Sequence, residues 1–185
     1  LNRVYDEVKV GKYKWDEKIV ETGTATDQTI EMGTGVKYDL TSGTVKSDTS
    51  TDTFFTVPAG SYPYTVDVNQ TLGEWNATNV LMKDELTPND KMQYIGYAKV
   101  EACEYNADTK AYDVKGTKWV KIAGLSSFAL KPSDLGWSDK NYAYRFIYYA
   151  MPANAEFSSA KVNNKFSLSG QVGKDGKLFN ISNIY

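Results

Sequence analysis

Short stretches in which apolar and polar residues alternate recur along this chain of 185 residues, and turn-forming residues separate them. Clear examples are DTFFTVPAGSYPYTVDVNQT (52–71), QYIGYAKVEACEY (93–105) and NYAYRFIYYAMP (141–152). Alternation with a period of two places successive side chains on opposite faces of a β-strand. NADTK (106–110) is typical of a hairpin turn, and AYDVKGTKWVKI (111–122) is its predicted return strand. The pattern predicts an all-β chain, and the spacing of strands and turns favours a β-sandwich.

Two segments depart from this pattern. Residues 21–52 are rich in Thr, Gly, Ser and Asp, and they predict either short strands or an irregular surface excursion. GLSSFALKPSDLGW (124–137) predicts a short helical turn capped by Ser126 or Ser127. We expect one domain over residues 1–185, and the start at LNRVYDEV leads us to expect a segment of a longer protein.

Composition excludes several classes of function. The chain has 21 basic and 23 acidic residues, so its charge gives no support to a nucleic-acid or membrane partner. It has no His, which excludes a His-based catalytic triad or a His-ligated zinc site. Cys103 is the single cysteine, so an intrachain disulfide cannot form. We therefore predict no metal and no cofactor.

A charged residue interrupts one apolar strand face. In NVLMKDELTP (79–88), alternation places Asp84 on the same face as Val80, Met82 and Leu86. An unpartnered carboxylate on a buried face costs several kcal/mol or takes up a proton. The alternative is an ordinary Asp that bonds backbone N–H groups near the turn.

Two further polar residues share this property. In KVNNKFSLSG (161–170), alternation places Asn164 with Val162, Phe166 and Leu168, and near the start Lys12 is in line with Val10. An apolar environment favours the neutral, nucleophilic form of a Lys amine and the protonated form of an Asp. A neutral Lys can attack a side-chain carboxamide polarised by a protonated Asp, and ammonia then leaves. The product is a Lys–Asn isopeptide bond.

The same stretches carry a family resemblance. NVLMKDELTPNDKMQYIGYAKV resembles the strand, turn and strand around the central Asp of isopeptide-forming domains in Gram-positive adhesins and pilins, particularly the collagen-adhesin (Cna-type) domains. KVNNKFSLSG is similar to the late strand with the bonded Asn, and VGKYKWDEKIV to the first strand with the bonded Lys. The resemblance implies an immunoglobulin-like, Cna-type β-sandwich. It implies a catalytic role for Asp84, and a cross-link between Lys12 (alternative Lys14) and Asn164 (alternative Asn163).

The prediction is a structural or adhesive domain of a bacterial surface adhesin or pilin. Its reaction would be a single self-modification, so we do not class it as an enzyme. We expect it to lie outside the cell and to be associated with the cell wall. Its partners would be neighbouring domains of the same protein and a host matrix protein or glycan.

Three other interpretations remain open at this stage. Trp75 and Trp137 lie in turn-like contexts and suggest a carbohydrate-binding β-sandwich without a cross-link, although aromatic side chains usually fill the core. A plain stalk spacer is the second alternative. Asp48 and Asp52 suggest a weak calcium site, but they lack the dense carboxylate spacing of a calcium loop.

Overall fold

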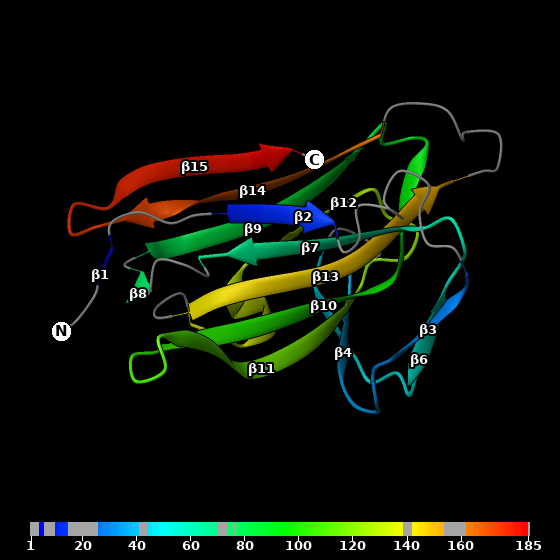
Figure 1. The fold of residues 1–185 in the computed structure, drawn as a ribbon, viewed down its shortest axis with the longest axis horizontal. Coiled ribbons are helices and arrows are strands. Elements are labelled where there is room, and N and C mark those ends of the chain that lie inside the picture. Colours follow the sequence, from blue (N-terminus) through cyan, green and yellow to red (C-terminus); the bar gives the residue numbers. More distant parts are fainter. Residues whose placement is uncertain are drawn as a thin grey trace.

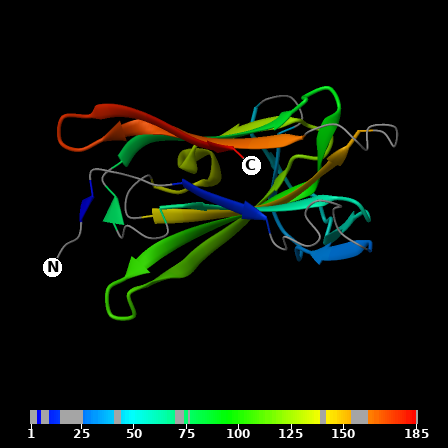
Figure 2. The same ribbon diagram turned by 45° about the horizontal axis from the view of Figure 1, so that its top comes forward.

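The structure is a computed structural model that describes residues 4–5, 10–14, 26–40, 44–69, 74–75, 77–138, 142–153 and 162–184. Its regular elements are strands, apart from one 3-10 turn, η1 (Pro132–Leu135). The two main sheets lie face to face, as Figures 1 and 2 show. The predicted all-β sandwich is therefore confirmed.

The larger sheet has seven described strands. Their order is β2 (Val10–Lys14), β7 (Tyr62–Val68), β13 (Tyr142–Pro152), β10 (Met92–Asn106), β11 (Ala111–Lys121), β4 (Lys37–Asp39) and β5 (Lys46–Asp48). Alternation decides which face is buried: Tyr64, Val66 and Val68 point into the sandwich from β7, and Tyr144, Phe146 and Tyr148 do so from β13.

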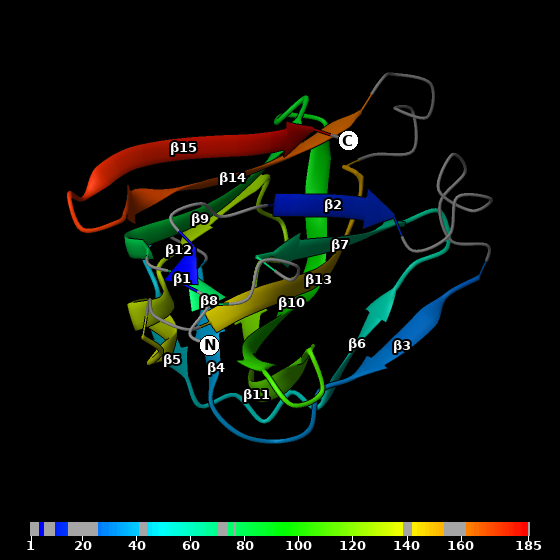
Figure 3. The ribbon, with the colours of Figure 1, turned by 60° about the vertical axis from the view of Figure 1, so that its left-hand side comes forward.

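The opposing sheet has four described strands. Their order is β12 (Ser127–Leu130), β9 (Ala77–Thr87), β14 (Asn163–Val172) and β15 (Lys177–Ile184). Met82, Leu86, Phe166 and Leu168 point inward and pack against the larger sheet. β2 lies against β14 and β15 of this sheet, so an early and a late segment of the sequence meet across the sandwich (Figures 1 and 3).

Two shorter pairs complete the described structure. β1 (Val4–Tyr5) pairs in parallel with β8 (Glu74–Trp75). β3 (Gln28–Glu31) pairs with β6 (Phe54–Val57) to form a ribbon beside the larger sheet (Figure 3). Under this ribbon lies a second apolar cluster of Phe55, Val57, Tyr97 and Tyr149. The described part of residues 21–52 therefore contains short strands.

The prediction of a helical turn capped by Ser126 or Ser127 was wrong about its start. Ser127 begins β12, whose residues pair with β9, and the turn begins at Pro132 with Lys131 as its N-cap. Sheet pairing competes successfully with a local capping preference here, because β12 buries Phe128 and Leu130 in the core.

β10 contains a bulge that shapes the centre of the sandwich. Ile95 pairs with Tyr149 and Lys99 with Ile147, so three residues of β10 lie opposite Tyr148 alone. Gly96 starts this bulge with φ +59°, and the Phe55 ring lies where a Cβ on Gly96 would be. A glycine is required here by both the backbone angle and the close approach of the ring.

Candidate functional site

Asp84 is fully buried between the two sheets. It lies on β9, and its register partners Phe128 on β12 and Phe166 on β14 are both buried aromatic residues. The interior position predicted from alternation is therefore correct. A carboxyl group in such surroundings needs hydrogen-bond donors, because it has lost its hydration.

Two tyrosines from the opposite sheet supply donors. The Tyr94 hydroxyl donates to Oδ2 of Asp84 at 2.6 Å, and the Tyr148 hydroxyl donates to Oδ1 at 2.6 Å. Each carboxyl oxygen thus receives a phenol O–H. Hydrogen bonds to a charged group are stronger than those between neutral groups, so the pair offsets part of the cost of burial.

The same Tyr148 hydroxyl also contacts the buried asparagine. Nδ2 of Asn164 donates to Oη of Tyr148 at 2.9 Å, and the Asn164 side chain is fully buried. Asp84, Tyr148 and Asn164 therefore form a hydrogen-bonded chain across the sandwich, which we call the buried triad. It uses three strands: β9 and β14 from one sheet and β13 from the other.

Burial keeps the phenols of this site protonated. The pKa values of Tyr94 and Tyr148 are raised well above the ordinary value, first by burial and then by the negative charge of Asp84. The hydrogen bond from Asn164 acts in the opposite direction on Tyr148. Both tyrosines are therefore hydrogen-bond donors to Asp84 at neutral pH.

Asn163 and Asn164 differ sharply in environment. Asn163 is exposed to solvent, whereas Asn164 points into the core next to Tyr148. Sheet alternation separates them, because adjacent residues of a strand face opposite sides. Only Asn164 of the two is part of the buried triad.

The backbone of β2 is described, but the side chains of Lys12 and Lys14 lie outside the described part of the structure. Lys12 pairs with Val66, which pairs with Phe146 of β13. Lys14 pairs with Tyr64, which pairs with Tyr148. We call these two sets the Lys12 row and the Lys14 row.

Contacts across the sandwich align these rows with the opposite sheet. In the Lys12 row, Phe146 packs on Phe166 with ring centroids 5.2 Å apart, and Phe166 is the register partner of Asp84. In the Lys14 row, Tyr148 accepts the hydrogen bond from Asn164. Tyr148 also donates to Asp84, so the Lys14 row contacts both Asp84 and Asn164, whereas the Lys12 row reaches the level of Asp84 through Phe166.

Trp75 and Trp137 are the two weakly predicted ligand-binding residues, and the structure describes the side chain of Trp137 alone. Trp137 is partly buried against the main core, with its ring centroid 6.1 Å from that of Tyr144. It also lies 3.3 Å from where a Cβ on Gly116 would be. The side chain of Trp75 lies outside the described residues. A glycan-binding role for either stays a prediction.

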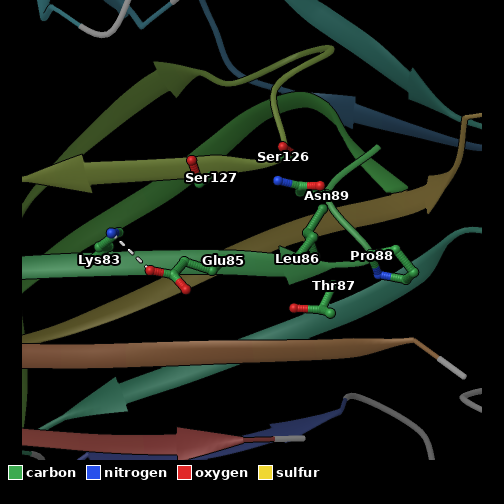
Figure 4. Close-up of a pocket in the computed structure, with 8 residues that line it drawn as sticks. All are labelled: Lys83, Glu85, Leu86, Thr87, Pro88, Asn89, Ser126 and Ser127. Carbon is green, nitrogen blue, oxygen red and sulfur yellow. Dashed lines mark ion pairs between the residues drawn. The ribbon is translucent and has the colours of Figure 1, made fainter. Parts of the chain in front are cut away.

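A cavity of about 550 Å³ lies along the end of β9 and the start of β12. Its described lining is Lys83, Glu85, Leu86, Thr87, Pro88, Asn89, Ser126 and Ser127 (Figure 4). Lys83 and Glu85 form an ion pair at 2.8 Å, which lowers the pKa of Glu85 mainly through their hydrogen bond. Both side chains are over a third exposed, so water weakens the pair.

The candidate calcium ligands are engaged in local contacts. Asp48 accepts a hydrogen bond from the Ser50 backbone N–H at 2.8 Å, and Asp52 accepts one from the Tyr97 hydroxyl at 3.1 Å. Among the described residues, no three His, Cys, Asp or Glu side chains gather closely enough to hold a metal ion. Within the same residues, no helix is long and apolar enough to cross a membrane.

No protein-family description matches the sequence, and no curated protein matches it. Among solved structures, the chain is similar to the collagen-binding subdomain of the Enterococcus faecalis surface protein ACE, with a TM-score of 0.46 and 13% identity. The match covers 80% of this chain and 91% of that chain. At this level of similarity it supports no conclusion about function.

The tyrosines are the site residues that the sequence pattern did not single out. Tyr94 and Tyr148 occupy inward positions of their strands, but so do other aromatic residues of the chain. Their hydroxyls meet Asp84 only because β10 and β13 pack across β9 in the opposite sheet. Alternation within one strand carries no information about that pairing.

Proposed function

We propose that this chain is a structural domain of an extracellular bacterial adhesin or pilin, and that it forms a Lys–Asn isopeptide bond between its two sheets. The observation that carries the proposal is the buried triad, in which an Asp and an Asn are both fully buried and joined through Tyr148. β2, the strand with Lys12 and Lys14, lies against β14, the strand with Asn164.

The environment suits the proposed chemistry. The triad lies among Phe128, Phe146 and Phe166, all buried, and an apolar environment favours the neutral amine that the reaction requires. The amine would attack Cγ of Asn164, and Nδ2 would leave as ammonia. The carboxyl group of Asp84 carries the protons and is regenerated at the end. The proposed reaction therefore needs no cofactor.

The two lysines are distinguished by their rows. The sequence pattern favours Lys12, while the register favours Lys14, because Tyr148 of the Lys14 row contacts Asn164 directly. The proposal requires the nucleophilic Nζ to reach Cγ of Asn164. A branched peptide identified by mass spectrometry would assign the nucleophile.

The bond would give the domain a mechanical function. It would join the strand near the start of the chain to one near its end, so a pulling force would load a covalent bond instead of strand ladders. A cross-link closing a loop of about 150 residues stabilises a fold by about 5 kcal/mol in the chain-entropy description of disulfides. Cys103 alone cannot provide such a link.

Intact mass spectrometry of the denatured protein tests the bond. We expect a deficit of one ammonia in the wild type and full mass in Asp84→Ala and Asn164→Ala. Asn163→Ala is the matched control and should retain the deficit, because Asn163 is exposed. Full mass in the wild type would leave the buried triad as a structural network and remove the cross-link from the proposal.

The predicted location has its own test. Antibody labelling of intact source cells should detect the protein on the outer surface. Labelling only after the cells are permeabilised would contradict a role as a surface adhesin or pilin, whatever the mass of the domain.

A further inference from the structure

Tyr148 contacts both ends of the proton path that the proposed reaction needs. Its Oη donates to Oδ1 of Asp84 at 2.6 Å and accepts from Nδ2 of Asn164 at 2.9 Å. Nδ2 is the atom that must leave as ammonia. The phenol therefore already holds the leaving nitrogen in the ground state.

We infer that Tyr148 is a catalytic residue that relays a proton from Asp84 to the departing amide nitrogen of Asn164. This inference rests on the proposed isopeptide reaction. In this inference Asp84 does not protonate the leaving group directly. Its proton reaches Nδ2 of Asn164 through the hydroxyl of Tyr148.

The hydrogen-bond geometry makes the relay chemically reasonable. An amide nitrogen donates hydrogen bonds and is a poor base, which agrees with the direction of the Asn164–Tyr148 bond. Once the Lys amine adds to Cγ, Nδ2 becomes an amine with a basic lone pair. The bond between Nδ2 and Tyr148 can then reverse, with the hydroxyl as donor, once the hydroxyl turns from Oδ1 and a protonated Asp84 donates to Oη in its place.

The atoms balance without an added reactant. The bond between Lys Nζ and Cγ of Asn164 forms, and the bond between Cγ and Nδ2 breaks. Asp84 takes up a proton from the Lys ammonium as the amine arrives, which leaves the amine neutral, and the carboxyl O–H then donates to Oη of Tyr148. This proton passes to Tyr148 as Tyr148 gives its own to Nδ2, and the Lys nitrogen then returns one proton to Asp84. The products are a secondary amide and one molecule of ammonia.

The two proton movements must be closely coupled. The pKa of Tyr148 is raised well above its ordinary value by burial, so a free phenolate in this position would be costly. The short bond to Asp84 provides the proton that replaces the one given away. Positioned acid catalysis of this kind typically accelerates a reaction by about 10² to 10⁴.

Tyr94 provides a matched control. It is a buried tyrosine that also donates to Asp84 at 2.6 Å, but to the other carboxyl oxygen, Oδ2, and no hydrogen bond to Asn164 is described for it. Tyr94→Phe removes one hydrogen bond to Asp84 and leaves the contact from Asp84 through Tyr148 to Asn164 intact. Tyr148→Phe removes a similar bond together with the relay.

The experiment measures how fast newly made protein loses ammonia. The wild type, Tyr94→Phe and Tyr148→Phe would be synthesised in a short cell-free pulse, and denatured aliquots would be weighed by mass spectrometry over time. We expect cross-linking in Tyr148→Phe to be slower than in Tyr94→Phe by a factor of about 100 or more. Near-ultraviolet circular dichroism of both variants would show that each packs as the wild type does.

A second variant keeps the test decisive if Tyr148→Phe does not fold. Fluorinated tyrosines of increasing acidity at position 148 change the phenol with little change in size. The cross-linking rate should vary more steeply with phenol acidity at position 148 than at position 94. Equal dependence at the two positions, or equal rates for the two Phe variants, would overturn the relay.

The outcomes separate this inference from the proposed function. A wild type that never loses ammonia ends the isopeptide proposal and the relay with it. A wild type that cross-links, with Tyr148→Phe as fast as Tyr94→Phe, refutes only the relay and leaves the isopeptide bond in place.

Discussion

Replacing Asn164 by Ala should lower the stability of this domain far more than any ordinary buried amide would. The substitution removes the proposed bond, which closes a loop of about 150 residues and is worth about 5 kcal/mol. It also leaves a small cavity where the buried side chain was, which costs about 1 kcal/mol. The expected loss is therefore about 6 kcal/mol, or a decrease in Tm of about 12 to 24 °C for a domain of this size.

Differential scanning calorimetry measures this decrease, with Asn163→Ala as the control. Asn163 is exposed, and its replacement should change the free energy of unfolding by no more than about 0.5 kcal/mol. Without a covalent bond, Asn164→Ala would cost only the hydrogen bond and a small cavity, about 1 to 2 kcal/mol. A decrease in Tm below about 8 °C would therefore refute the reasoning.

Calorimetry of lysine variants would identify which lysine is bonded to Asn164. Lys12→Met and Lys14→Met should differ, because only one of the two amines can be bonded to Asn164. The variant that lacks the nucleophile should lose about 5 kcal/mol and regain the mass of one ammonia. Equal and small losses for both would point to a domain without a cross-link.

Three further predictions concern the framework around the site. Gly96→Ala should destabilise the fold by about 2 to 4 kcal/mol in chemical denaturation, because Gly96 has a positive φ and an added Cβ would overlap the Phe55 ring. Gly124→Ala is the control: Gly124 also has a positive φ but has open space around it, so the substitution should cost about 1 kcal/mol. Lys37→Ala should cost about 1 to 3 kcal/mol in the same assay, since this buried side chain donates to two backbone carbonyls and each such hydrogen bond is worth about 1 kcal/mol. A loss of stability below about 0.5 kcal/mol would contradict this. Burial and a hydrogen bond raise the pKa of Tyr97 to about 12, above its unfolded value, so its contribution to stability should be complete below about pH 10 and decrease as pH rises toward 12. Tyr97→Phe should therefore lose less stability than the wild type between about pH 10 and pH 12, and equal losses in the two proteins would contradict this.

The strands and the two buried polar residues were predictable because they depend on local periodicity. Asp84 and Asn164 each lie at an inward position of a strand whose other inward residues are apolar. A shift of one residue in either strand would have exposed them, and the apolar side chains on the same face prevent that shift. The choice of Asn164 over Asn163 follows from the same rule.

The partners of Asp84 were not predictable, because they depend on how distant strands pair. Tyr94 and Tyr148 reach the carboxyl group from β10 and β13, and those strands must lie opposite β9 for the hydroxyls to converge. The bulge at Gly96 adds to this arrangement, since it places Tyr148 opposite three residues of β10. Isolated strand patterns contain no information about packing of this kind.

The order of events in the proposed reaction follows from where the polar groups lie. Asp84, Tyr148 and Asn164 are held by strands inside both sheets. Among the described strands of the larger sheet, β2 lies at an edge and pairs with β7 alone. An edge strand has ladder hydrogen bonds on one side only, so we expect β2 to dock last and to detach first under load. The phenols satisfy Asp84 before the amine arrives, and the site can assemble without the bond. The cross-link would then attach the strand that is otherwise the weakest point of the sandwich.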